Sequence, residues 1–172
     1  MDDKKLKMYQ EFGSKLIEEG KEFLRKATPM NKVIYPKMRI GGTVQYFTGV
    51  FPVLNDEKYH TTDINTWKTI IKNDWTNKKK YVSDTFDCDN FSNSFCAYCA
   101  DIYELNTAGR FTVALLDKKG KHVSFHRAVI IIDSKLECYL LESQNDKIVK
   151  LVKGRLPVID GMQYKVNYIS LS

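Results

Sequence analysis

The sequence predicts an α+β fold in which helices come first and an antiparallel sheet follows. Before residue 106, apolar residues recur in several segments at the three- and four-residue spacings of helices. After residue 110 they gather in short runs separated by turn residues, which is typical of strands. Because short turns join these runs, we expect neighbouring strands to be antiparallel.

Helices are expected at residues 3–27, in a segment that runs through about Trp75 and for which Thr61-Thr62-Asp63-Ile64 supplies the cap residues, and at residues 87–106. The first is amphipathic, although Gly13 and Gly20 weaken it. Asp87 is a good N-cap for the third, and Gly109 suits the left-handed position that ends it. Residues 32–54 mix short apolar runs with glycine and proline, so irregular strands and loops are expected there.

The strands of the predicted sheet are residues 111–116, 123–132, 136–141, 147–152 and 163–171. Turns are expected at Asp117–Lys121 and at Ser134–Lys135. The chain is expected to form a single domain over residues 1–172, with a core over 60–172 and an N-terminal helix that can be accessory.

The composition limits the classes of binding partner and the cellular compartment that are expected for this protein. The net charge is +6, but the basic residues are scattered and no nucleic-acid-binding signature occurs, so a lysine-rich surface is favoured over a nucleic-acid partner. No signal core and no apolar run of about 20 residues is present, and three of the four cysteines crowd into one helix. We therefore expect a soluble cytoplasmic or otherwise intracellular protein with free thiols.

Cys88 is the candidate chemical centre. It opens the third helix and stands among Asp87, Asp89 and Asn90. A helix N-terminus lowers the pKa of a thiol through its free amides and its dipole, and the thiolate is the reactive form. An inert core thiol is the alternative interpretation of a cysteine on an apolar helix face.

A nucleophilic cysteine needs a base and a group that orients that base. If residues 123–132 and 136–141 form a hairpin about position 134.5, His126 pairs near residue 143, next to Glu142. By the same count His122 falls opposite residue 147, past the strand. The register therefore selects His126 as the base and Glu142 as the orienting carboxylate.

These residues resemble a known superfamily. A helix that starts Asp-Cys-Asp-Asn-Phe, followed by His126 and then Glu142-Ser-Gln, is similar to the papain-like and transglutaminase-like cysteine peptidases. It is most similar to the Cys-His-Glu peptidase domain of Marasmius agglutinin-type chimeric lectins, to which Trp75 and Tyr81 also correspond. Asn90 and Ser143 depart from that pattern, where an Asp and a Pro are usual.

The resemblance implies a papain-like fold with a nucleophile-bearing central helix, and a thiol-dependent hydrolase that acts on amide bonds of a peptide or protein substrate. Water as acceptor would make it a cysteine peptidase or amidase, and an amine would make it transglutaminase-like. An oxyanion hole is expected from the Cys88 backbone N–H and Tyr81. No cofactor is required, but the resemblance allows calcium, for which Asp87 and Asp89 are candidate ligands.

Two other hypotheses about the function stay open. Cys96, Cys99, His122 and His126 have the pair spacings of zinc ligands, although the two cysteines are expected in mid-helix. The chain can also be an interaction protein that keeps the fold without catalysis. Metal analysis tests the first, and thiol labelling tests the second.

Overall fold

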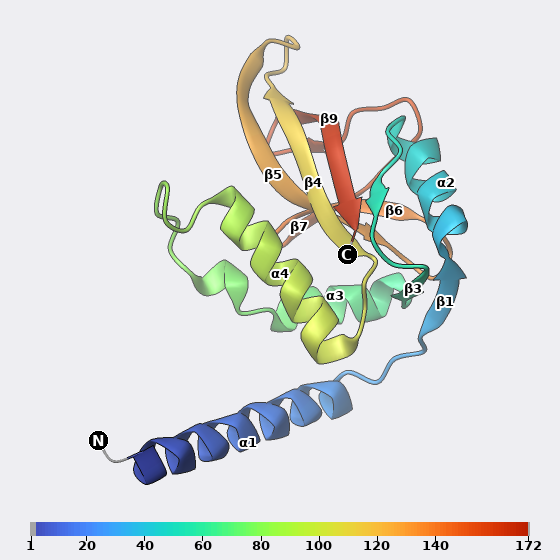
Figure 1. Cartoon of the computed structure of the whole chain (residues 1–172). Helices are drawn as coiled ribbons and strands as arrows, with labels where there is room; N and C mark the ends of the chain where they lie inside the picture. Colours follow the sequence, from blue (N-terminus) through green and yellow to red (C-terminus); the bar gives the residue numbers. More distant parts are fainter. Residues whose placement is uncertain (1–2, 172) are drawn as a thin grey trace.

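A computed structural model describes residues 3–171, with side chains from residue 5 onward (Figure 1). Within this range, four helices and a largely antiparallel sheet confirm the α+β prediction, although three short strands lie between the helices along the chain. The helices are α1 (Asp3–Ala27), α2 (Lys37–Thr48), α3 (Ile64–Asn73) and α4 (Cys88–Tyr103), with a 3-10 turn η1 (Thr76–Lys78). The strands are β1 (Val33–Pro36), β2 (Val53–Leu54), β3 (Lys58–Thr61), β4 (Ala108–Leu116), β5 (His122–Ile132), β6 (Cys138–Glu142), β7 (Lys147–Lys150), β8 (Val158–Ile159) and β9 (Met162–Leu171).

The main sheet has the strand order β2-β9-β4-β5-β6-β7, and β8 pairs with β9 at its side. Neighbours are antiparallel except β2 and β9, which are parallel. β1 and β3 form a separate two-stranded ribbon. The long β4–β5 hairpin reaches well beyond the rest of the sheet (Figure 1).

The sheet is covered on both faces, and each face has its own core. On one face Ile40 and Val44 of α2 pack against the buried Phe111 and Ile130. On the other face helices α3 and α4 pack Trp67, Phe95 and their neighbours onto Val129 and Ile131. Successive strand side chains point to opposite faces, so the apolar run that ends β5 serves both cores.

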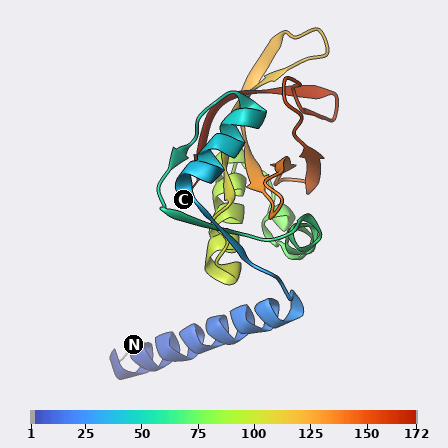
Figure 2. The same cartoon turned by 90° about the vertical axis from the view of Figure 1, so that its right-hand side faces the viewer.

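Helix α1 stands apart from this body (Figures 1 and 2). Near its end Lys21 pairs with Asp101 at 2.7 Å, and the Arg25 Nε donates to the Ile102 carbonyl at 2.6 Å. Phe12 and Phe23 remain 61% and 71% exposed, so most of its apolar stripe is uncovered by the described chain. In the described residues no helix combines the length and the apolar character that a bilayer crossing needs.

Two expectations for local structure are wrong. Residues 32–54 contain helix α2 rather than only strands and loops. Position 41 of this helix takes a glycine because the Phe51 ring packs where a Cβ would stand. Helix α4 ends at Glu104, which takes the left-handed conformation with φ 54°. Gly109 instead lies within β4, where it has no capping role.

Gly109 supplies a test of this packing. A Cβ on it would stand 2.6 Å from the Ser170 carbonyl oxygen and 2.8 Å from the Leu171 side chain. We expect Gly109→Ala to lower the free energy of unfolding by about 2 kcal/mol, because backbone of β9 would have to move. Chemical denaturation measures the change.

Gly42→Ala is the matched control, since nothing lies within 4 Å of its added Cβ on α2. It should raise the free energy of unfolding by about 0.5–1 kcal/mol through helix propensity. Equal stability of Gly109→Ala and the wild type would contradict the close pairing of β4 with β9.

Candidate functional site

The start of helix α4 is fixed by a reciprocal cap. The Asp87 side chain accepts a hydrogen bond from the Asp89 backbone N–H at 3.3 Å, and the Asn90 side chain accepts one from the Asp87 N–H at 3.3 Å. These bonds make Cys88 the first residue of the helix. Its thiol therefore lies where unpaired amides and the helix dipole favour negative charge.

The neighbouring part of β5 has a free edge. The ladder between β5 and β6 runs from Ile132↔Cys138 to Val129↔Leu141 and stops there. At this edge the Arg127 backbone N–H donates to the Cys88 thiol, and its guanidinium lies 3.4 Å from the Asp89 carboxylate. The end of the ladder thus leaves room for the start of α4 beside β5.

His126 and Glu142 meet just beyond the end of that ladder. The His126 Nε2 lies 2.6 Å from the Glu142 Oε2, and their side chains are only 13% and 7% exposed. The Cys88 thiol lies close enough to the His126 side chain for each group to shift the pKa of the other. The structure therefore brings together all three residues that the sequence selected.

Electrostatics couple the thiol to the imidazole. The hydrogen bond with His126 is the largest influence on Cys88 and lowers the pKa of its thiol, against the effect of burial. Burial by itself lowers the pKa of His126, but its bonds to Cys88 and Glu142 outweigh burial and raise that pKa to about 9. Both shifts favour a thiolate–imidazolium pair near neutral pH.

The other thiols have the opposite character. Burial raises the pKa of Cys96 to about 12, and it also raises the pKa of Cys99 and of Cys138. These thiols stay protonated and pack within or beside the two cores. Cys88 is the cysteine whose surroundings favour the reactive form.

The four candidate zinc ligands are not assembled. Cys96 and Cys99 lie within α4, and the His122 ring packs on Phe125 with centroids 4.8 Å apart. His126 is engaged by Glu142. Within the described residues no three His, Cys, Asp or Glu side chains form a group able to hold a metal ion.

Tyr81 and the two candidate calcium ligands have other surroundings. Tyr81 is 51% exposed and precedes the tight turn closed by the Val82–Phe86 bridge, and no recorded contact in the described chain joins it to the triad. Asp87 caps α4, and Asp89 pairs with Arg127. Both carboxylates at the start of α4 therefore already bind groups of the protein itself.

The structure adds two residues that the sequence did not reveal. The buried Tyr164 hydroxyl donates to the Glu142 Oε2 at 3.2 Å, and the Tyr164 ring meets the His126 ring edge-on at 6.0 Å. Arg127 supplies the backbone N–H that reaches Cys88. Tyr164 lies on β9, far along the chain, so no local spacing could have indicated it.

Comparison with solved structures identifies chains of similar fold. One is the lectin of Polyporus squamosus bound to the human-type influenza-binding epitope Neu5Acα2-6Galβ1-4GlcNAc, with 12% identity and a TM-score of 0.59 over 80% of this chain and 49% of that one. Another is a PSL1a–E64 complex, with 14% identity and a TM-score of 0.57 over 80% of this chain and 51% of that one. This chain thus spans about half of each neighbour, and likeness at such low identity shows the fold alone.

No protein-family model and no curated protein matches the sequence. The predicted membership of the papain-like and transglutaminase-like superfamily is corrected by these findings, because the similar chains are those of a lectin. As class names taken from that superfamily, hydrolase and cysteine peptidase are wrong by the same findings, because the similar chains are those of a lectin. The resemblance rested on one short motif and the order of three residues, and such constellations recur on unrelated folds.

The shifted pKa values predict how fast Cys88 is alkylated. With iodoacetamide at pH 7, Cys88 should react at least about tenfold faster than Cys96, Cys99 or Cys138, because only the thiolate attacks. The rate should fall as the pH drops through the lowered pKa of Cys88. Mass spectrometry of the alkylated peptides gives the four rates.

His126→Asn should slow the labelling of Cys88 at pH 7 by about tenfold, since the thiolate loses its cation. His122→Asn is the matched control on the same strand and should leave the rate unchanged. Uniform slow labelling of all four thiols would contradict the thiolate–imidazolium pair.

The contact with Glu142 sets an expectation for the pH at which His126 titrates. Its carboxylate helps hold the His126 pKa at about 9, so an NMR titration of the His126 ring should show a midpoint near that pH. Glu142→Gln keeps the shape but removes the charge, and the midpoint should fall by about one pH unit. An unchanged midpoint in this variant would show that Glu142 does not stabilise the charged ring.

Proposed function

We propose that this protein is a thiol-dependent enzyme that attacks the carbonyl carbon of amide or peptide bonds. Cys88 is the nucleophile, His126 is the general acid and base, and Glu142 orients the imidazole and stabilises its charged form. The proposal is carried by the connected path from the Cys88 thiol through the His126 ring to the Glu142 carboxylate at a helix N-terminus. It rests on this geometry and not on a family assignment.

The chemistry follows from the charge states. The Cys88 thiolate adds to the carbonyl carbon, and the imidazolium of His126 then gives its proton to the departing amine as the C–N bond breaks. The acyl group is left as a thioester on Cys88. His126, now neutral, takes a proton from the incoming water or amine, which attacks the thioester and releases the thiolate.

The oxyanion formed in each step needs donors. The backbone N–H of Cys88 is the first amide of α4 and has no partner within the helix, so it can donate to the oxyanion. Glu142 must stay ionised to accept a hydrogen bond from His126. The Tyr164 hydroxyl donates to the Glu142 Oε2 and the Gln144 N–H donates to the Glu142 Oε1 at 3.4 Å, and both bonds stabilise the ionised carboxylate.

A peptide or protein substrate fits the surroundings best. Exposed apolar side chains precede both reactive residues along the chain: Val82 before Cys88, and Val123 and Phe125 before His126. Phe125 is 70% exposed and stands on the projecting β4–β5 hairpin. Such side chains can hold the apolar residues of an extended chain, and free thiols suit a reducing intracellular location.

Glycan binding is a second candidate function. It is favoured by one observation, the sialylated trisaccharide bound to the Polyporus squamosus lectin. That lectin chain is about twice as long as the matched part, so the glycan can belong to its other half. Titration of the same trisaccharide into this protein, followed by calorimetry, separates the two candidates.

Loss of the thiol should abolish the reaction. With a library of fluorogenic peptide amides, we expect Cys88→Ala to lower turnover by at least about 1,000-fold, because no other group can form the acyl-enzyme. Cys96→Ala, on the same helix, is the matched control and should retain turnover. E64 should protect Cys88 from iodoacetamide if it occupies this site.

Equal turnover by Cys88→Ala and wild type would overturn the proposal. So would trisaccharide binding by a wild-type protein that turns over no amide. If Cys88 is labelled fast but the protein turns over no amide, the thiolate–imidazolium pair is supported and the proposed reaction is contradicted.

A further inference from the structure

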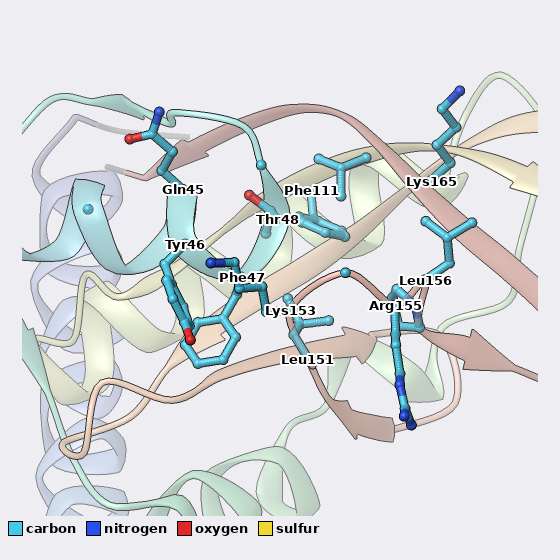
Figure 3. A pocket seen from close by; sticks show the side chains of 15 residues that line it. Gln45, Tyr46, Phe47, Thr48, Phe111, Leu151, Lys153, Arg155, Leu156 and Lys165 are labelled. Carbon is cyan, nitrogen blue, oxygen red and sulfur yellow. The ribbon is translucent and has the colours of Figure 1, made fainter.

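A hollow lies away from the triad, on the α2 side of the sheet. It has a volume of about 750 Å³ and is bounded by the C-terminal half of α2, the segment after β7, and strands β4 and β9 (Figure 3). No member of the Cys88–His126–Glu142 triad lines it. Its volume falls within the range of sites that bind small molecules.

The interior of the hollow is apolar and partly aromatic. The buried Phe111 and Leu151 form its floor, and Tyr46 and Phe47 of α2 form one wall. The Tyr46 and Phe47 rings meet edge-on with centroids 5.1 Å apart. Leu156 lines the hollow from the segment after β7 (Figure 3). A flat apolar body would remove these surfaces from water.

The mouth of the hollow is cationic. Lys153, Arg155 and Lys165 stand around it, and none of its lining residues is Asp or Glu. In Figure 3, Arg155 and Lys165 extend from the rim in opposite directions, while Lys153 lies toward Tyr46. The Lys153 Nζ is 4.4 Å from the Tyr46 ring centroid, a cation–π contact that holds this charge at the wall.

These cations contrast with their neighbours along the chain. Lys147 pairs with Asp160, and Lys150 pairs with Glu137 at 2.6 Å, both outside the hollow. Over the described residues, Lys153, Arg155 and Lys165 form no ion pair. Three positive charges without an acidic partner surround one apolar hollow. They attract an anion and can each pair with it once it is bound.

We propose that this hollow binds a small aromatic anion, with its flat body between Tyr46 and Leu156 and its phosphate or similar group at the mouth. The aromatic wall and floor favour a planar body over a flexible chain. The long lysine and arginine side chains can swing from the rim onto the anionic group, and the guanidinium suits phosphate geometry. This site is independent of the proposed chemistry at Cys88.

1-Naphthyl phosphate is the probe, because it joins a planar aromatic body to one phosphate. We expect saturable one-to-one binding by calorimetry, and Lys153→Gln, Arg155→Gln and Lys165→Gln combined should weaken it at least about tenfold. Tyr46→Ala should weaken it about fivefold through loss of the aromatic wall. Binding should also weaken as salt is added.

The control removes the same charge elsewhere. Lys118→Gln, Lys119→Gln and Lys121→Gln combined alter the β4–β5 turn, which does not line the hollow, and should leave the affinity within about twofold. Equal weakening by both triple variants would overturn the site and indicate general attraction to a basic protein. Equal binding of neutral 1-naphthol would contradict the claim that the site recognises an anionic group. Tighter binding of dodecyl phosphate would contradict the claim that it prefers a planar aromatic body.

Discussion

The hydrogen bond between the His126 Nε2 and the Glu142 Oε2 is the contact on which the candidate site depends. At 2.6 Å it joins β5 to β6 just after their backbone ladder has stopped. It fixes the plane of the imidazole and assigns Nε2 to the carboxylate, so that the ring is held beside Cys88. Without it, a thiol at a helix start would lie beside a ring of undefined orientation.

Burying the charged groups of the triad costs desolvation free energy, and hydrogen-bond donors around them offset that cost. A thiolate, an imidazolium and a carboxylate in a low-dielectric site carry one net negative charge, which needs donors. The helix N-terminus and the Arg127 N–H serve the thiolate, and the Tyr164 hydroxyl serves the carboxylate. Each donor comes from a different element, so the charges are stable only when α4, β5, β6 and β9 are assembled.

The same sheet carries two unrelated candidate sites. The free edge of β5 holds the thiol and its partners, whereas the surface beneath α2 holds an apolar hollow with a cationic mouth. The fold is shared with part of a lectin chain, and folds host many functions, so the arrangement of side chains decides what each place can do. The hollow and the triad can therefore be tested, and can fail, separately.

Local hydrogen bonds and short turns made much of this protein readable from its sequence. The Asp63 and Asp87 caps lie within three residues of the amides or side chains they bind, so the starts of α3 and α4 were predictable. The β5–β6 hairpin is centred on residue 135, because Ile132 pairs with Cys138 and Val129 with Leu141, half a residue from the predicted centre at 134.5. That small error still left His126 within reach of Glu142, because a short loop leaves little freedom of pairing.

Long-range packing decided the rest. Helix α2 contains two adjacent glycines, and it forms because the core of the sheet accepts Ile40 and Val44, which no local pattern reports. Tyr164 reaches Glu142, and Lys165 reaches the hollow, only because β9 pairs with β4 from the far end of the chain. The sequence by itself determined which three residues meet at the candidate site and where their helices and turns lie. The tertiary structure alone decided which partners orient and charge them, since those partners meet across the sheet and not along the chain.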